Sequence, residues 1–455
     1  MDLDRWLLEA KQGYDDWLAT FPPFTSHPVL DVTDAELAGP FAELAGRLRD
    51  NYPFGHPSYA AQMLKPPHPV ALVGYLAAMQ VNPNNHALDG GPATAQMEKE
   101  VVAALAGTFG LPEHLGHLTS SGTIANLEAL FVARESHPGR GVAFSADAHY
   151  THARMCHLLG VRAFTVETDA AGRMDLTALE SLLQSEDVGT VVCTLGTTGL
   201  GAVDPLDRVL DLCSRYGARV HVDAAYGGFF RLIADDSVDG VESGPWLATA
   251  RADSIVVDPH KHGLQPYGCG AVLFRDPSVR RFYKHESPYA YFTSDDLHLG
   301  EISLECSRAG AAAAALWLTL QVFPLTADGL GAVLRPGRRA ALRWAGLLAQ
   351  STELALYQLP ELDIVTYLPR ISSGLLSDLD AASAAAMTRG MHDAQNPVFL
   401  ATYAVSASAL ASRGHPVVAD VVQGRILRSV LMKPEAEQTV DALHARVCAL
   451  VTQET

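Results

Sequence analysis

The sequence predicts an α/β protein built on a mostly parallel sheet that is covered by helices on both faces. From about residue 94, short runs of β-branched and apolar residues alternate with longer amphipathic stretches. This alternation is typical of strands that are joined by helical crossovers. The composition is that of a globular protein, because 48% of the 455 residues are hydrophobic and 18% are charged.

The expected elements of this unit follow one another in a regular order. Helices are expected over 95–109, 121–135, 149–159, 176–184 and 206–216, and strands over 142–145, 162–167, 190–195, 219–222, 254–257 and 270–274. In sheets of this kind, ligands bind beyond the carboxyl ends of the strands. The polar residues that follow the strands are therefore the first candidates for a site.

The two ends of the chain have different patterns. Residues 1–50 are typical of amphipathic helices, and residues 51–70 are rich in Pro, His and Tyr. Such a segment cannot easily form its own core, so it is expected to pack on the body of the chain or on a second copy. After an Ala-rich helix over 309–323, the pattern resets to a smaller α+β unit. We therefore expect an N-terminal helical and extended segment (1–85), a large domain (86–325) and a small C-terminal domain (326–455).

The charge and the cysteines limit the classes of function. The net charge is -18. The electrostatic field of such an acidic chain argues against binding nucleic acid or an anionic membrane. The six cysteines form no C-x-x-C pair, and this usage is typical of a reduced cytoplasm. The N-terminus lacks the pattern of a signal peptide, and no apolar stretch is long enough to span a bilayer. A cytoplasmic protein is expected.

Lys261 stands in the most informative stretch of the chain. The apolar run 254–257 is typical of a short buried strand, and Asp258-Pro259-His260-Lys261 follows it directly. Burial disfavours a charged lysine and lowers its pKa, which makes the amine nucleophilic. An isolated lysine in a turn is usually solvated, so a chemical role for Lys261 depends on the residues at the other strand ends.

Three of those ends carry polar or small residues. Ser121-Gly122-Thr123 opens a helix, where free backbone N–H groups and the helix dipole favour an anion, although an ordinary N-cap has the same pattern. His149 follows a strand, and its imidazole could stack on a flat ring. Asp223 follows a β-branched run, and a buried carboxylate needs a cationic partner, which could equally be a core arginine.

Together these residues are the parts needed to hold pyridoxal phosphate. Lys261 would form the Schiff base, and Asp223 would pair with the protonated ring nitrogen that makes the ring an electron sink. Gly122, Thr123 and His260 would hold the phosphate. A metal site is rejected, because His149 and His152 are three residues apart but no Glu or Cys ligand set accompanies them.

Three linked motifs carry a resemblance to a known family. The stretches 195–198 (Leu-Gly-Thr-Thr), 221–227 (His-Val-Asp-Ala-Ala-Tyr-Gly) and 258–261 (Asp-Pro-His-Lys) resemble the group II pyridoxal-phosphate-dependent amino-acid decarboxylases, over roughly residues 50–445. These include aromatic-amino-acid, tyrosine, glutamate and aspartate decarboxylases. The resemblance implies a fold-type I homodimer with a seven-stranded sheet in the large domain and active sites at the subunit interface.

The resemblance also implies roles for individual residues. Lys261 matches the Schiff-base lysine, Asp223 the acid at the ring nitrogen and His149 the stacking histidine. The remaining cofactor-binding candidates are Ser121, Gly122, Thr123, Ala225, Asp258, His260 and one of the pair Thr197 and Thr198. Arg428 matches an arginine that binds the substrate carboxylate, and a bidentate guanidinium suits that task. Arg308 is a second candidate that we assign to structure or to the mouth of the site.

The sequence constrains the reaction and the substrate less than it constrains the cofactor. Tyr289 and Tyr291 lie where the family has a loop tyrosine that protonates the carbanion, and the sequence does not choose between them. Decarboxylation of an L-amino acid is expected, with retro-aldol cleavage or an aminotransferase-type reaction as alternatives. Where many eukaryotic members have tryptophan after the lysine, this chain has His262, which weakens any inference from their substrates.

The region 52–86 is expected to line the substrate pocket. Its candidates are Phe54, Asn85 and His86, which offer an aromatic wall and hydrogen bonds but no cation. An aromatic or neutral amino acid is therefore mildly favoured. Aspartate or glutamate remains an alternative, and aspartate would need an arginine from the partner chain.

Overall fold

The computed structural model describes residues 1–235, 237–283 and 297–452. Its centre is a seven-stranded sheet with the order β1-β7-β6-β5-β4-β2-β3. These strands are β1 (Leu115–Thr119), β2 (Gly141–Ser145), β3 (Ala163–Val166), β4 (Val188–Thr194), β5 (Arg219–Asp223), β6 (Ser254–Val257) and β7 (Gly270–Phe274). Neighbours from β6 to β3 pair in parallel, and only β7 is antiparallel to its neighbours. The predicted mostly parallel α/β fold is confirmed.

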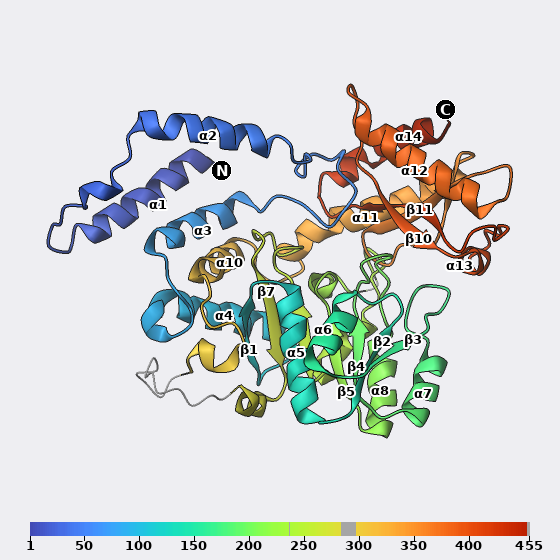
Figure 1. Cartoon of the computed structure of the whole chain (residues 1–455), viewed down its shortest axis with the longest axis horizontal. Coiled ribbons are helices and arrows are strands. Elements are labelled where there is room, and N and C mark those ends of the chain that lie inside the picture. The colour runs from blue at the N-terminus through green and yellow to red at the C-terminus, as the bar shows by residue number, and fades with distance from the viewer. Residues whose placement is uncertain (236, 284–296, 453–455) are drawn as a thin grey trace.

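Helices cover both faces of this sheet, because its strands are apolar on both sides. Along β4, Val191 and Cys193 pack into the larger core cluster with α7 and α8, whereas Val192 packs on the opposite face with α5 and α6. The helices of this unit are α4 (Pro92–Thr108), α5 (Gly122–Ser136), α6 (Thr151–Leu159), α7 (Leu176–Ser185), α8 (Leu206–Tyr216), α9 (Gly244–Leu247) and α10 (Gly310–Val322). Figure 1 shows α5 and α6 together on one side of the sheet.

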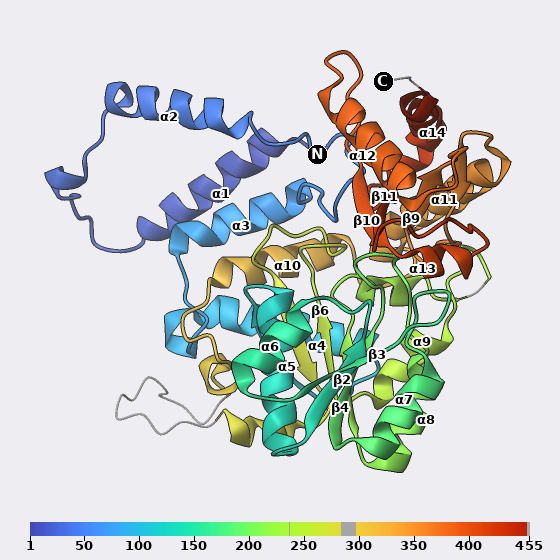
Figure 2. The ribbon, with the colours of Figure 1, turned by 45° about the vertical axis from the view of Figure 1, so that its right-hand side comes forward.

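A second, four-stranded antiparallel sheet with the order β10-β11-β9-β8 forms the core of the C-terminal part. Its elements are α11 (Leu330–Gln350), β8 (Leu354–Leu356), β9 (Ile364–Pro369), α12 (Leu376–His392), β10 (Ala401–Val405), α13 (Ala407–Ala411), β11 (Gly424–Val430) and α14 (Ala436–Thr452). In Figure 2 this unit lies against the end of the large sheet that β3, β2 and β4 occupy. The division of the chain at residues 85 and 325 stays a prediction.

The N-terminal helices are α1 (Leu3–Leu18), α2 (Asp34–Leu48) and α3 (Pro69–Val81). Helix α1 packs on α3, and α3 packs on α10. No residue of α1 or α2 is buried, and Figures 1 and 2 show α2 extending away from the rest of the chain. No described helix is long and apolar enough to cross a bilayer.

The structure differs from the sequence expectation in two strands and in the starts of helices α4, α5 and α6. Strand β1 was not expected, because Gly116 and His117 interrupt its apolar run; buried His117 is accommodated by Glu128 at 2.9 Å. Strand β8 is only three residues long. Helix α6 begins at Thr151 instead of 149, so His149 lies in the turn that precedes the helix.

Replacing Leu427 by alanine should destabilise the protein by about 2–5 kcal/mol, because a buried leucine loses its contacts and leaves a cavity. Leu427 is fully buried in the middle of the four-stranded sheet. Chemical denaturation should show the lower unfolding midpoint. The matched control is Leu359→Ala, at a position that is 71% exposed, and an equal loss in both variants would contradict the packing described.

Candidate active site

A cavity of about 230 Å³ lies at the carboxyl ends of the central strands. All of the cofactor-binding residues expected from the sequence line it, apart from Thr197. The expected residues that line the cavity are Ser121, Gly122, Thr123, His149, Thr198, Asp223, Ala225, Asp258, His260 and Lys261. Because these residues come from five separate turns, the parallel sheet itself brings them together.

Lys261 lies in the turn after β6, and its ammonium faces a carboxylate. Lys261 Nζ is 3.0 Å from Asp258 Oδ2, and its side chain is 21% exposed. The lysine is therefore less enclosed than its place after a buried strand suggests.

Its neighbour Leu264 has a left-handed backbone, with φ of 66°, and strain of this kind persists only where surrounding contacts fix the turn. One such contact is the bond from His68 N to Leu264 O.

Asp223 ends β5 and is buried, and it has no arginine partner among the described residues. Its Oδ2 lies 2.9 Å from His152 Nε2, and its Oδ1 accepts a bond from the Ala225 amide at 3.1 Å. Burial by itself would raise the pKa of Asp223. The hydrogen bond and charge of His152, with the Lys261 ammonium, more than offset burial and hold that pKa below its usual value.

The start of α5 forms a second wall of the cavity. Ser121 caps this helix by accepting a bond from Ile124 N at 3.3 Å. Gly122 has no room for a side chain, because a Cβ there would collide with the Asp258 carboxylate. Burial lowers the pKa of His260, against the charge of Asp258. A neutral imidazole and a helix N-terminus are both suited to an anion.

His149 lies in the turn between β2 and α6. Its Nδ1 is 2.6 Å from Thr151 Oγ1, which fixes the orientation of the ring. Burial lowers the pKa of His149, and the Asp223 carboxylate only partly opposes this effect. A neutral, fixed imidazole in the cavity wall can cover the face of a flat ring.

The two threonines after β4 have different environments. Thr198 lines the cavity, whereas the Thr197 hydroxyl is fully buried and accepts a bond from Ala202 N at 3.1 Å. Arg428 is also buried, in β11, and holds this loop. Its guanidinium donates to the carbonyls of Thr198 at 2.6 Å and Gly199 at 2.9 Å, and to Ala61 O at 3.1 Å.

The residues expected to contact the substrate do not line this cavity in the same chain. Phe54 packs edge-on against Tyr59, with ring centroids 5.0 Å apart. Asn85 is fully buried, and its amide bonds Glu98 and Thr94. His86 lies beside the Cys306 carbonyl. Tyr289 and Tyr291 lie outside the described residues.

Arg308 belongs to a structural network. It donates to Glu98 Oε1 at 2.7 Å and also to the Leu118 carbonyl. This arrangement ties the segment before α10 to β1 and α4, as the structural interpretation of Arg308 expects. No group of potential metal ligands is found among the described residues.

Sequence reasoning missed several residues of the site. Asn126 and Tyr226 line the cavity, and His152 contacts Asp223 from outside it. His152 was considered only as a metal ligand, and no local pattern pointed to its contact with Asp223. Tyr226 stands in the Asp-Ala-Ala-Tyr motif but was given no role.

Tyr226 connects the cavity to the second sheet. Its hydroxyl donates to Asp363 Oδ1 at 2.5 Å, and His262 Nε2 lies 3.2 Å from Asp363 Oδ2. The His262 ring packs on Tyr226, with centroids 4.6 Å apart. Burial raises the pKa of Asp363 to about 6, against the bond from Tyr226 and the charges of Lys65 and Arg338.

The comparisons with known proteins agree with this geometry. An α/β fold with a lysine, an acid and a helix N-terminus around one cavity defines a class of pyridoxal-phosphate enzyme. A family model described as the pyridoxal-dependent decarboxylase conserved domain matches residues 53–367. The chain therefore belongs to the pyridoxal-dependent decarboxylase family, and the expected cofactor, lyase class and amino-acid decarboxylation are confirmed at the level of the family.

Relatives with assigned names are similar over part of their length. The chain is 28% identical over 380 residues to an L-tyrosine decarboxylase of Enterococcus faecium, covering 62% of each protein. It is 31% identical over 296 residues to a probable L-tyrosine/L-aspartate decarboxylase of Methanoculleus marisnigri, covering 65% of this chain and 76% of the relative.

Solved structures show the same fold across nearly the whole chain. Mouse CSAD superposes with a TM-score of 0.78 at 22% identity, over 98% of this chain and 92% of the mouse protein. Oryza sativa TDC with PLP and tryptamine superposes with a TM-score of 0.77 at 20% identity, over 98% of both chains. The fold-type I architecture is thus confirmed.

The residues that line the cavity are suited to pyridoxal phosphate. Gly122 keeps the start of α5 open where any Cβ would fill it. The Asp223 carboxylate is held ionised, which suits a ring nitrogen that carries a proton. Lys261 reaches the same cavity with its amine, which suits an aldehyde.

The Asp363→Asn variant should change how stability depends on pH. The wild-type carboxyl has a pKa of about 6 when folded and about 3.9 when unfolded. As the pH rises through this interval, the unfolded chain releases the proton first, so this group lowers stability by on the order of 2–3 kcal/mol. The free energy of unfolding of wild type minus that of Asp363→Asn should therefore fall between pH 4 and 6 and level off above. A difference that rises with pH would contradict this assignment.

Proposed function

We propose that this chain decarboxylates an L-amino acid to the corresponding amine, with Lys261 and Asp223 as its central residues. The observation that carries the proposal is that both side chains face one cavity, whose third wall is the N-terminus of α5. Pyridoxal phosphate supplies, when bound, an electron sink for the pair of electrons left by the departing CO2.

Each residue of the cavity has a task in this proposal. Lys261 would hold the cofactor through its aldehyde, and Asp258, whose Oδ2 lies 3.0 Å from Lys261 Nζ, would orient the amine. Asp223 holds the proton at the ring nitrogen. Gly122, Thr123 and His260, with Ser121 beside them, would hold the phosphate. His149 would cover one face of the ring, and Ala225 and Thr198 would border it.

The remaining expected residues concern protonation of the α-carbon and binding of the substrate. Tyr289 or Tyr291 would return a proton to the α-carbon, as the sequence leads us to expect. Arg428 binds the substrate carboxylate, which requires it to exchange bonds with the carbonyls of Thr198 and Gly199. Phe54, Asn85 and His86 remain candidates for substrate contacts, contributed to the site of a second copy.

We infer an aromatic or neutral substrate, with aspartate as the alternative. Among the described residues that line the cavity, Lys261 is the one lysine or arginine that could face a substrate side chain. The names of the relatives support both choices, since one is an L-tyrosine decarboxylase and another a probable L-tyrosine/L-aspartate decarboxylase. Retro-aldol cleavage on the same fold is the second candidate reaction, because the orientation of the substrate alone selects the bond that breaks.

The purified protein should be yellow, should release CO2 from L-tyrosine or L-aspartate, and should retain the cofactor covalently on Lys261 after borohydride reduction. Lys261→Ala should lose the covalent label and at least about 10³-fold in kcat, because it lacks the amine that this chemistry requires. The control is Lys99→Ala, a partly exposed lysine of α4. An aldehyde product without CO2 would favour the lyase, and turnover by Lys261→Ala would refute the scheme.

We propose further that the chain functions as a homodimer in the cytoplasm. The described cysteines are all free, and four of them are buried, which agrees with a reducing compartment. Support for a dimer comes from α2, whose Leu37, Phe41, Leu44 and Leu48 are each more than half exposed. These residues recur on one side of the helix, and an unpartnered stripe of this kind marks a contact surface.

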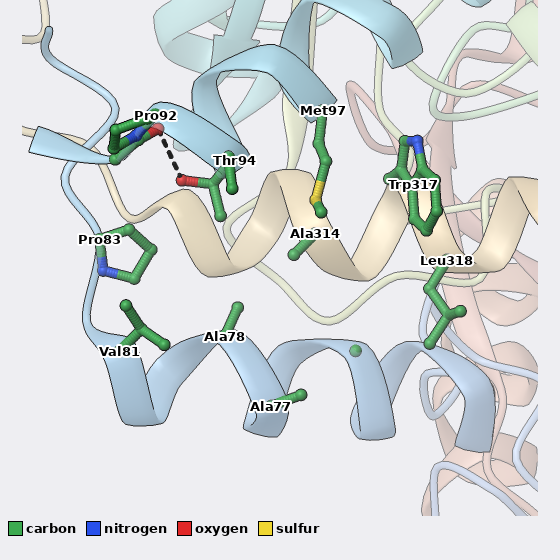
Figure 3. A pocket seen from close by; sticks show the side chains of 13 residues that line it. Ala77, Ala78, Val81, Pro83, Pro92, Thr94, Met97, Ala314, Trp317 and Leu318 are labelled. Carbon is green, nitrogen blue, oxygen red and sulfur yellow. Dashed lines mark hydrogen bonds between the residues drawn. The ribbon is translucent and has the colours of Figure 1, made fainter. Parts of the chain in front are cut away.

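A second apolar surface lies near these helices. It is a groove of about 350 Å³ between α3, α4 and α10. Figure 3 shows Ala78 and Val81 of α3 on one side, with Trp317 and Leu318 of α10 and Met97 of α4 around it. The occupant that we propose is a second copy of this chain, so that the N-terminal segment packs on its partner.

Phe41→Asp should weaken the dimer, because a charge on the apolar stripe must be desolvated at the interface. Analytical ultracentrifugation across a range of concentrations should show dimers of the wild type and a dissociation constant raised at least about tenfold in the variant. Ala42→Asp adds the same charge on another side of α2 and serves as the control. A monomeric wild type, or equal weakening by both substitutions, would contradict the proposed surface.

A further inference from the structure

His152 lies behind the cavity and contacts its acid directly. It stands in the first turn of α6 and is fully buried, while the next histidine of the helix, His157, is exposed. Its Nε2 lies 2.9 Å from Asp223 Oδ2. The ring also packs near Phe144, with centroids 5.9 Å apart. Among the described residues, the hydrogen-bond partner of the His152 side chain is Asp223.

The geometry identifies which ring nitrogen carries the proton. Asp223 is ionised, so its oxygen can only accept, and the proton of the 2.9 Å bond belongs to His152 Nε2. The other nitrogen, Nδ1, is buried and has no hydrogen-bond partner among the described residues. Of the two ring nitrogens, Nε2 is therefore the one with an acceptor within reach among the described residues.

A second donor approaches the same oxygen but is held more loosely. Asn126 Nδ2 lies 3.4 Å from Asp223 Oδ2 and 2.9 Å from the Gly122 carbonyl. Its Oδ1 lies 2.8 Å from His221 Nε2, which fixes the orientation of the amide. Burial lowers the pKa of His221 to about 3. His152 thus supplies the shorter and better directed bond to Oδ2.

We propose that His152 is a positioning residue that acts on the reaction through Asp223, by donating a hydrogen bond that keeps the proton of the acid–ring nitrogen pair on the nitrogen. This inference rests on the proposed function, in which Asp223 faces the cofactor's ring nitrogen. No sequence motif pointed to this role.

The chemical reason lies in the competition of two bases for one proton. A hydrogen bond to a carboxylate stabilises the anion and lowers its affinity for a proton. With that bond, the proton resides on the ring nitrogen and the ring withdraws electrons most strongly. Without it, the proton shifts toward Asp223 and the ring becomes a weaker electron sink. The proton only changes its position within the pair, so no other reactant is needed.

The test compares His152→Gln, which retains a donor near the position of Nε2, with His152→Phe, which fills the space but donates nothing. The first readout is the pH titration of the visible absorption band of bound pyridoxal phosphate. The titratable groups that face the pair are His149, His221, Asp258 and Lys261, and they are unchanged in both variants. The midpoint should shift by at least about half a pH unit in His152→Phe and should stay near the wild-type value in His152→Gln.

The second readout is the rate. His152→Phe should lower kcat by about tenfold or more with little change in KM, since a bond to a charged group is lost in the step that needs the electron sink. His152→Gln should restore kcat to within a few fold. His157→Phe is the matched control on the exposed side of α6 and should resemble the wild type in both readouts.

Two outcomes would overturn the inference. One is a His152→Phe protein that titrates and turns over like the wild type, and the other is a His152→Gln protein as impaired as His152→Phe. If His152→Phe fails to fold, the comparison of His152→Gln with the shorter His152→Asn decides, because only Gln can reach Oδ2. Titration of the cofactor band needs no turnover, so it tests His152 even if the protein does not decarboxylate amino acids.

Discussion

The ionised carboxylate of Asp223 is the constraint on which the site depends. A charge at the end of a buried strand is unstable unless several groups satisfy it, and here these groups come from three places. The Ala225 amide belongs to the same turn, His152 comes from α6, and Asn126 comes from α5. The two helices that cover this face of the sheet are therefore also the helices that keep the acid charged.

The C-terminal unit, with the second sheet at its core, supports the turns that line the cavity. Asp363 accepts a hydrogen bond from the Tyr226 hydroxyl, and Arg428 donates hydrogen bonds to the carbonyls of Thr198 and Gly199. Arg338 adds bonds to the carbonyls of Asp239 and Leu362 at 2.9 Å each. These contacts link the turns after β4 and β5 to β9 and β11. The second sheet thus holds the turns that form the cavity walls, although the described residues that line the cavity all belong to the first unit.

Much of the fold was predictable from local patterns, because the strands of a sheet buried on both faces are continuous apolar runs. The positions of Lys261 and Asp223 were predictable for the same reason, since a polar residue at the end of such a run stands out. Strand β1 was missed because Gly116 and His117 break its run, and only the distant Glu128 makes His117 acceptable there.

The partners of these residues were harder to predict from sequence. His152 and Asp223 are separated by 71 positions, and nothing local shows that they meet. Arg428 was expected to face a substrate, but its guanidinium is directed to backbone carbonyls from residues that are hundreds of positions away. Contacts of this kind depend on the packing of whole elements, which sequence periodicity does not encode.

The way in which Arg428 holds the chain bears on protein engineering. A carbonyl oxygen is the same in every residue, so the bond to Ala61 does not constrain which side chain stands there, whereas Gly199 is fixed because a Cβ would collide with Tyr403. Ala61 is nevertheless buried in a cluster with Tyr59 and Ala401, so packing limits position 61, whereas the exposed Gln62 beside it can be varied while the backbone clamp stays in place. Position 62 is thus a surface site at which the chain can be changed while the acid, the lysine and their supports stay untouched.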